Sequence, residues 1–204
     1  MTPARRPRLR LCYPGDHALA PSTDLATALG HIEAALPGDA TVEAHRSTMR
    51  EFLVEHPDAL DRTCEPGHLT GSAMVIDPAT GRFLLMLHAK LGAWFEPGGH
   101  ADGNATLPGV AWREATEETG IVGLTLAVPA IDLDIHEVGP PHGPHLHLDV
   151  RYLAVAPPGA VPVRNHESLD LRWAAADELA DFGVDPGSHR LARAALAALD
   201  ELRL

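Results

Sequence analysis

The sequence predicts an α/β protein, built as a sandwich in which helices cover both faces of a sheet. Its 204 residues, 45% of them hydrophobic, suffice for one domain with a substantial core, or for one domain plus a small appendage. Two helical patterns open the chain, and from His68 the hydrophobic period changes to that of strands. Further helical patterns alternate with those strands, and such alternation is typical of the α/β class.

Residues 1–66 predict a small helical segment ahead of the sheet. The first helical pattern runs from 23 to 36, with leucine and isoleucine at helical spacing, and Pro37 stops it. The second pattern runs from 41 to 56, and Pro57 ends it. We expect the two helices to form a hairpin that packs on the main domain.

Seven later segments have the composition of strands, and helices close the chain. The turn residues at 77–81 join the first two segments into a hairpin. Two closing helices are expected, a short one at 177–180 and a longer one at 188–202. The expected strands are 69–76, 82–88, 94–95, 124–128, 131–138, 146–156 and 169–173.

A further helix is expected over 107–119, and the functional prediction depends on it. Thr106 can serve as its N-cap, and Pro108 is tolerated in its first turn. Gly120 suits the C-terminal end, where a left-handed backbone conformation is common.

Glu114, Glu117 and Glu118 share one narrow face of this helix. At about 100° per residue, Glu117 lies roughly 60° to one side of Glu114 and Glu118 roughly 40° to the other. Such crowded charges destabilise a helix unless a cation compensates them, and Mg²⁺ prefers oxygen ligands. The preceding Gly98 and Gly99 would let the backbone approach that ion closely. An isolated group of glutamates with this spacing is more often a solvated acidic surface. The choice between that surface and a metal site therefore depends on the surrounding residues.

Those surroundings resemble the Nudix box, Gly-x5-Glu-x7-Arg-Glu-U-x-Glu-Glu-x-Gly-U, in which U is an aliphatic residue. Here the box runs from Gly99 to Ile121 in the correct register. The resemblance implies a Nudix-type α/β/α sandwich with a mixed sheet over 67–204, preceded by the helical extension 1–66. The matching positions are Gly99, Arg113, Glu114, Glu117, Glu118, Gly120 and Ile121.

The resemblance also implies a role for each of these side chains. Glu117 and Glu118 would bind a divalent ion, Mg²⁺ or Mn²⁺, with help from the carbonyl of Gly99. Glu114 would be a further ligand or the base that activates water, and Arg113 would orient it.

Two features of the site leave alternatives open. In several Nudix families the base comes from a loop outside the box. Glu167 is the candidate for it here, with Glu137 behind it, although each could be an ordinary surface carboxylate. Ala105 replaces the first glutamate of the box, which in the family often supports the arginine or the outer metal shell. We expect Asp102 or Glu96 to substitute for it.

The thirteen histidines are many for this length. His145 and His147 stand two apart and would project from one face of a strand, with His136 and His142 nearby. This spacing would suit zinc or copper, but hydrogen-bonded strand residues or residues of the substrate pocket are the alternatives, and the pocket is favoured. Protonated histidines would partly replace lysines beside an anionic substrate. The candidates for substrate contact are His100, Trp94, His145 and His147. For the tryptophan, which could stack on a base, core filling is the favoured role.

The implied function is that of a metal-dependent hydrolase that cleaves the diphosphate linkage of a nucleoside diphosphate derivative. The alternative is a Nudix-fold nucleotide sensor or interaction module whose catalysis is weakened by Ala105. The isomerase branch that acts on prenyl diphosphates is disfavoured, because it lacks the intact acidic string found here.

The composition limits which binding partners and which cellular compartment are to be expected for this protein. A net charge of −12 disfavours nucleic acid, and no run approaches the roughly 20 apolar residues that span a membrane. Cys12 and Cys64 stand far apart and are expected to be free thiols in the cytoplasm. The expected partner is a small molecule. A homodimer is a further expectation from the family, whose members often dimerise.

Overall fold

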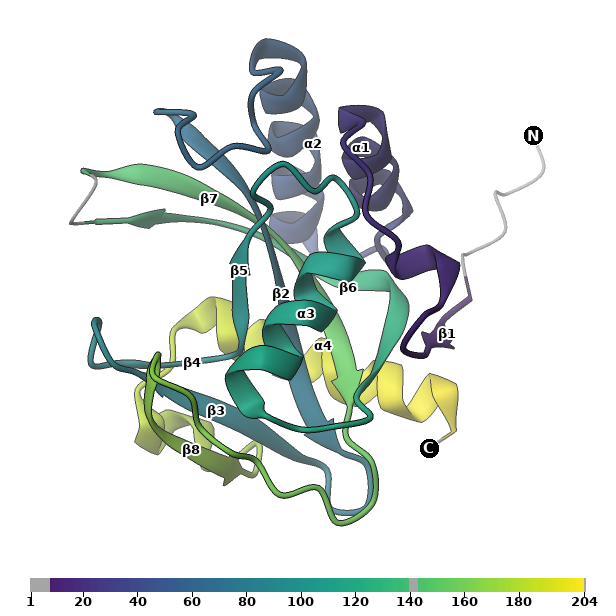
Figure 1. Ribbon diagram of the computed structural model, residues 1–204, viewed down its shortest axis with the longest axis vertical. Helices are drawn as coiled ribbons and strands as arrows, with labels where there is room; N and C mark the ends of the chain where they lie inside the picture. The colour runs from purple at the N-terminus through teal and green to yellow at the C-terminus, as the bar shows by residue number, and fades with distance from the viewer. Residues whose placement is uncertain (1–7, 140–142, 204) are drawn as a thin grey trace.

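The computed structural model describes residues 8–139 and 143–203, so His142 lies outside the described residues. The helices in Figure 1 are α1 (Leu25–Ala34), α2 (Ala40–Glu55), α3 (Leu107–Thr119) and α4 (Pro186–Leu202), with the short 3-10 helices η1 (His17–Leu19) and η2 (Leu179–Phe182). The strands are β1 (Arg10–Cys12), β2 (Gly67–Asp77), β3 (Arg82–His88), β4 (Trp94–Phe95), β5 (Gly98–His100), β6 (Thr125–Val138), β7 (His145–Val155) and β8 (Ser168–Ala174). None of the described helices has the length and apolar character needed to cross a membrane.

The eight strands form one mixed sheet, as the resemblance implied. Its order is β1-β6-β7-β2-β3-β4, with β5 paired to β2 and β8 paired to β3. β2 and β7 run parallel over 67–76, and the other pairs are antiparallel. β5 pairs with Thr70–Ser72 in the first half of β2, and β3 pairs with Val75–Asp77 in the second half. The strand that leads toward α3 is therefore anchored to the centre of the sheet.

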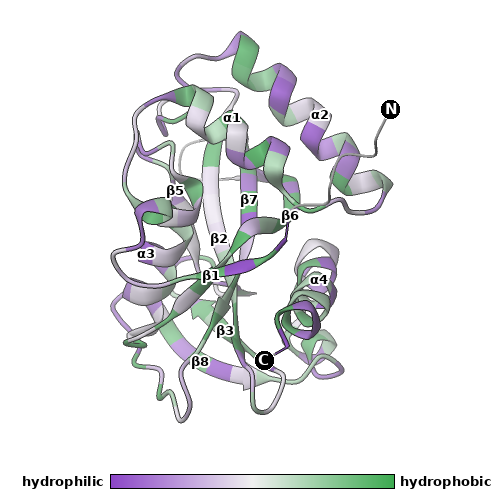
Figure 2. Ribbon diagram, turned by 90° about the vertical axis from the view of Figure 1, so that its right-hand side faces the viewer, coloured by the Kyte–Doolittle hydropathy of each residue, from purple (hydrophilic) through white to green (hydrophobic). Residues whose placement is uncertain are grey.

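Helices cover both faces of this sheet, so the predicted sandwich is confirmed. Successive side chains of a strand point to opposite faces, and β2 shows this alternation. Ala73 and Val75 pack in a core with α1, α2 and α3, whereas Met74 and Ile76 pack in a second core with α4. Figure 2 shows α3 and α4 on opposite sides of the sheet.

The N-terminal segment packs into the same core as α3. Ile32 of α1 is fully buried there, together with side chains of α2 and β2. The carbonyl oxygen of Leu19 lies 2.6 Å from the position that a Cβ on Gly109 would occupy. Only glycine therefore lets the chain cross α3 so closely. Asp24 and Asp39 cap α1 and α2 by accepting hydrogen bonds from backbone N–H groups, so the helices start near their expected positions.

Three local details differ from the sequence-based expectations. Thr106 is the N-cap residue of α3 as expected, but its side chain makes no capping hydrogen bond, because its hydroxyl donates to the Ala20 carbonyl at 2.8 Å. The segments 124–128 and 131–138 belong to one strand, β6, whose register against β7 shifts between them. The short helix expected at 177–180 is the 3-10 helix η2, which starts two residues later.

Candidate active site

Strand β5 and helix α3 bring two glycines against two glutamates. The Gly98 N–H donates to Glu118 Oε2 at 2.9 Å. A Cβ on Gly99 would lie 2.5 Å from Cδ of Glu114, so the position accepts only glycine while that carboxyl keeps its place. Neither glycine has a positive φ. Glycine is required here because it leaves space, and not because it permits a turn.

Burial gives these glutamates unusual protonation behaviour. Glu118 is 4% exposed, and its pKa is raised to about 8, mainly by burial and also by the charges of neighbouring glutamates, against the opposing effect of the hydrogen bond from Gly98. Burial also raises the pKa of Glu114, against the opposing charge of Arg113, whose guanidinium lies 2.7 Å from Glu114 Oε1. Crowded carboxyl groups that resist ionisation are stabilised in their charged form by a divalent cation.

Glu117, the third acidic residue of the box, is exposed. Two sets of three potential ligands have their ligand atoms within 4.8 Å of one another in the described part of the chain, and both contain histidine rather than the three glutamates. Only Glu114 and Glu118 are therefore gathered against β5. Like charges repel, so a cation would have to draw Glu117 toward them.

The loop that carries Glu167 is tied to the C-terminal end of α3. Asn165 donates from Nδ2 to the Glu117 carbonyl at 3.2 Å and accepts the Glu167 N–H at 2.8 Å. The charge of Glu167 contributes to the raised pKa values of both Glu114 and Glu118. The structure thus places Glu167 beside the acidic face of α3. Glu137, the reserve candidate, is exposed on β6.

Arg113 takes neither of the partners that we expected to replace the missing box glutamate. Asp102 accepts a hydrogen bond from Arg62 Nε at 2.7 Å. Glu96 is 8% exposed, and its Oε1 lies 3.4 Å from the guanidinium of Arg151. Other arginines engage both carboxylates, so neither forms an ion pair with Arg113, although the pKa of Asp102 is lowered by Arg62 and also by the charge of Arg113. Arg113 pairs instead with the next residue of its own helix.

The N-terminal segment covers the position of the missing glutamate. Ala105 is fully buried, and its N–H donates to the Ser22 carbonyl at 2.6 Å. The side-chain oxygen of Asn104 accepts hydrogen bonds from the N–H groups of Ser22 and Thr106, at 3.2 and 3.0 Å. A charged side chain in place of Ala105 would be buried beneath this segment, which is unfavourable without a partner. This packing gives a physical reason for the alanine.

A buried network of charges that the sequence analysis missed lies between β6, β7 and α4. Its centre is Arg151, whose side chain is 3% exposed and lies 2.9 Å from Asp149 and 3.1 Å from Asp134. Arg190 of α4 lies 2.9 Å from Asp132 and 2.7 Å from Asp134. The signal in the sequence is the spacing of two between charged residues on two strands, which places both pairs on one sheet face.

Five histidines lie ring against ring on the strands, with centroid distances of 4.9 to 5.5 Å. The pKa of His68 is lowered to about 4 and that of His147 to about 3, in both cases mainly by burial and also by the charges of neighbouring histidines. The His147 ring is therefore neutral at pH 7, contrary to the positive charge expected of it. The pKa of His136 is raised instead, because the effect of burial is outweighed by its hydrogen bond to Asp134 and by the nearby carboxylates. The sequence did not single out His68, because only the parallel pairing of β2 with β7 places it opposite His147. The five are His68 of β2, His100 of β5, His136 of β6, and His145 and His147 of β7.

Trp94 packs as a core residue. Its ring meets that of Phe182 edge-on, with centroids 5.0 Å apart. Both rings pack against the hydrophobic core on the α4 face of the sheet. Of the two roles that the sequence left open, stacking on a base or filling the core, the contacts favour the core.

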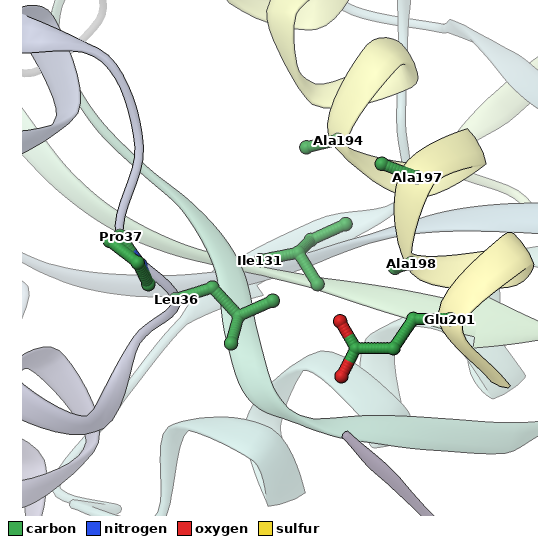
Figure 3. Close-up of a pocket in the computed structure, with 7 residues that line it drawn as sticks. All are labelled: Leu36, Pro37, Ile131, Ala194, Ala197, Ala198 and Glu201. Atoms are coloured by element: carbon green, nitrogen blue, oxygen red, sulfur yellow. The ribbon is translucent and has the colours of Figure 1, made fainter. Parts of the chain in front are cut away.

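Two pockets lie between α4 and the segment that precedes α2. The one in Figure 3, of about 110 Å³, is lined mainly by aliphatic side chains such as Leu36 and Ile131, with the carboxylate of Glu201 at one side. Its neighbour, of about 250 Å³, includes Arg190 and Arg193. Neither lining contains a glutamate of α3. The acidic site beside β5 is therefore separate from both pockets.

Known proteins resemble this chain in sequence and in fold. A family model described as the NUDIX domain matches residues 67–195. A Mycobacterium tuberculosis protein with the provisional name 8-oxo-dGTP diphosphatase 3 is 34% identical over 100 residues, which is 47% of this chain and 43% of that relative. The chain thus spans less than half the length of the curated relative that it matches.

Two solved structures share the fold. The Ap4A hydrolase of C. elegans, in a binary complex, has a TM-score of 0.54 and 20% identity, over 65% of this chain and 97% of that one. The dihydroneopterin triphosphate pyrophosphohydrolase of E. coli has a TM-score of 0.51 and 16% identity, over 61% of this chain and 92% of that one. At these identities the likeness concerns the fold alone.

The fold and the site define an α/β/α domain with an acidic helix set against a glycine strand. Gly120 closes that helix in the left-handed conformation, with φ of 63°, as predicted. With the family model matching more than half of the sequence, the chain belongs to the Nudix family. Hydrolases of this family generally use divalent metal ions.

Proposed function

We propose that this protein is a metal-dependent hydrolase that cleaves the diphosphate linkage of a nucleoside diphosphate derivative. The observation that carries the proposal is the pair of largely buried carboxyl groups, Glu114 and Glu118, held against Gly98 and Gly99 in the register of the Nudix box. Family membership supports the reaction class. The name of the M. tuberculosis relative supports a nucleotide as substrate.

The donor set of the site fits Mg²⁺ or Mn²⁺, which prefer hard oxygen ligands. Among the described residues, a backbone hydrogen bond from Gly98 reaches one oxygen of Glu118, and the second oxygen can face an ion. A Cβ on Gly99 would fill the space beside Glu114. We assign Glu114, Glu117, Glu118 and the Gly99 carbonyl to hold the ion. When bound, the ion would supply charge neutralisation at the diphosphate and a lowered pKa for water.

Glu167 is the proposed general base, and Arg113 is the proposed positioning residue. The side chain of Glu167 is 47% exposed, so its carboxylate can exchange protons with solvent. It accepts the proton of a water whose oxygen bonds to one phosphorus while the bridging P–O bond breaks and its electron pair leaves with the departing phosphate. Arg113 holds the Glu114 carboxylate at 2.7 Å and so fixes its orientation.

A cytoplasmic location and a small-molecule partner complete the proposal. Cys12 and Cys64 are both buried free thiols, which suits a reducing compartment. The net charge of −12 would repel the phosphate backbone of a nucleic acid, whereas a metal-bound nucleotide carries its own compensating charge.

A hydrolysis screen with excess Mg²⁺ tests this proposal, using nucleoside triphosphates, dinucleoside polyphosphates, nucleotide sugars and dinucleotide cofactors. We expect phosphate products from at least one class. Changing a group one shell outside a metal typically reduces activity about 10- to 100-fold, so Glu118→Gln should reduce kcat/KM by more than about 100-fold. Glu51→Gln, at an exposed glutamate of α2, is the matched control and should retain wild-type rates.

Two results would contradict the proposal. One is a Glu118→Gln variant with wild-type turnover under saturating Mg²⁺. The other is a wild-type protein that binds nucleotides but releases no product from any class, which would favour the nucleotide sensor with weakened catalysis.

A further inference from the structure

We propose that His68, His100 and His147 form a binding site for a transition-metal ion of the zinc type, distinct from the carboxylate site of the Nudix box. One ligand atom from each of the three rings lies within 4.8 Å of the other two. The ring centroids are 4.9 Å apart for His68 and His100, 5.0 Å for His68 and His147, and 5.1 Å for His100 and His147. The three rings therefore surround one point.

The backbone of the sheet fixes this arrangement. His68 of β2 and His147 of β7 are register partners in the parallel pairing, and His100 of β5 is the register partner of Thr70, two residues along β2. Side chains two apart on a strand share a face, so the three histidines project from one face of three adjacent strands. A site built on paired strands holds its ligands more firmly than one built on loops.

The spacing of the rings is close to that of a tetrahedral site. Nitrogen atoms bound to zinc at about 2.0 to 2.1 Å lie about 3.3 Å from one another. The separations here are at most 4.8 Å, so small rotations of the side chains would close the site. Three protein ligands leave a fourth position open, which is the arrangement of zinc sites that also bind water or substrate.

Unsatisfied polar atoms point independently to a ligand. His68 is 2% exposed, and neither of its ring nitrogens makes a hydrogen bond of good geometry, although the backbone of Cys64 lies close enough to oppose the lowering of its pKa. Nε2 of His147 is also buried without a partner. Buried polar atoms are nearly always satisfied, so such atoms on two neighbouring rings need an explanation. A metal ion would satisfy a lone pair on each of these two rings.

The surrounding histidines support the three ligands. His145 lies 4.9 Å from His68 by ring centroid, and its Nδ1 donates to the Gly143 carbonyl at 3.0 Å. That hydrogen bond fixes the orientation of the His145 ring beside the three ligands and leaves their fourth position open. Nδ1 of His136 lies 3.0 Å from an oxygen of Asp134, which fixes its ring beside His147.

The two sites differ in chemistry and lie on opposite faces of β5. Gly99 faces Glu114, whereas the ring of the next residue, His100, meets the histidines. Imidazole nitrogen favours Zn²⁺, Ni²⁺ and Cu²⁺, whereas carboxylate oxygen favours Mg²⁺ and Mn²⁺. The protein can therefore hold a zinc-type ion at the histidines while the Nudix box is filled with Mg²⁺.

Binding of Co²⁺ to the full chain in excess Mg²⁺ tests this site, because tetrahedral Co²⁺ has a characteristic visible absorption. We expect one Co²⁺ per chain, displaced by Zn²⁺. His147→Asn should weaken Zn²⁺ binding by at least about 100-fold, because it removes a direct ligand. Glu118→Gln should leave the Co²⁺ spectrum unchanged, which separates this site from the proposed catalytic one.

A second set, His56, Asp58 and Cys64, also has ligand atoms within 4.8 Å of one another and supplies the matched control. His56→Asn should leave the Co²⁺ spectrum unchanged, and no thiolate band should appear in the near ultraviolet. The proposal is overturned if wild-type protein gives no tetrahedral spectrum, if His147→Asn keeps it with full affinity, or if Glu118→Gln or His56→Asn abolishes it. The wild-type titration decides the matter even if a histidine variant does not fold.

Discussion

Substitution of Gly99 by alanine adds one methyl group and should reduce the activity while leaving the stability nearly unchanged. In Gly99→Ala the new Cβ would lie 2.5 Å from Cδ and 2.6 Å from Oε1 of Glu114. Two carbon atoms in contact need about 3.5 Å, so the Glu114 carboxyl must retreat by about 1 Å. A displacement of about 1 Å in a catalytic group can reduce activity about 100-fold. We therefore expect kcat/KM to fall by about that factor.

The folding free energy should change little in the same variant. The atoms that the Cβ meets belong to the end of a flexible side chain, and alanine restricts the unfolded chain more than glycine does. We expect the free energy of unfolding to change by no more than about 1 kcal/mol. Denaturant unfolding and Mg²⁺-dependent hydrolysis would be measured on the same sample.

Gly30→Ala is the matched control, because Gly30 lies in α1 and a Cβ there would meet nothing within 4 Å. It should raise the free energy of unfolding by about 0.5 to 1 kcal/mol and leave the rate unchanged. Wild-type kcat/KM in Gly99→Ala would refute the contact between Gly99 and Glu114 as a requirement for activity. A Gly99→Ala chain that does not fold would refute the separation of activity from stability.

Three further predictions concern the loop base, the box arginine and the buried network. Glu167→Gln should lower kcat by about 100-fold or more while Mn²⁺ affinity stays at the wild-type value, and equal losses in both would show that Glu167 is a ligand. Asp102→Asn should reduce stability by less than about 1 kcal/mol and leave kcat/KM unchanged, because Asp102 pairs with exposed Arg62; a large loss of activity would show that Asp102 supports the box after all. Burial opposes ionisation of Asp149, but Arg151 and other neighbours hold its pKa below the ordinary value. Asp149→Asn should therefore reduce the free energy of unfolding by its full amount above about pH 4, the ordinary pKa. This loss of stability should shrink as the pH falls through the pKa that Asp149 has in the folded protein. Urea unfolding at several pH values checks this, and a loss that grows toward acid would contradict it.

The parts of the fold that depend on local sequence were predictable. The bounds of α3, 107–119, and its left-handed glycine follow from helical periodicity and end signals within one stretch of chain. The register of the box then places Glu114 and Glu118 one turn apart, and their common contact with the glycine strand follows. Thr106 is the N-cap residue as predicted, but its hydroxyl does not cap the helix, because it donates to the carbonyl of the distant residue Ala20.

The parts that depend on pairing between distant segments could not be read from the sequence. Arg62 and Asp102 are forty positions apart, and their ion pair removes the carboxylate that we expected beside the box arginine. His68 joins His147 because β2 and β7 run parallel, and that order is a property of the whole sheet. The presence of alanine at position 105 is likewise explained by the N-terminal segment that packs on it, and not by the other residues of the box.

The most direct test of the central claim is Mn²⁺ binding to the carboxylate site, followed by electron paramagnetic resonance. The account predicts Mn²⁺ that competes with Mg²⁺ and binds at least about 100-fold more weakly to Glu118→Gln, with His147→Asn and Glu51→Gln as unaffected controls. Wild-type protein that binds no Mn²⁺, or a Glu118→Gln variant with unchanged affinity, would contradict it.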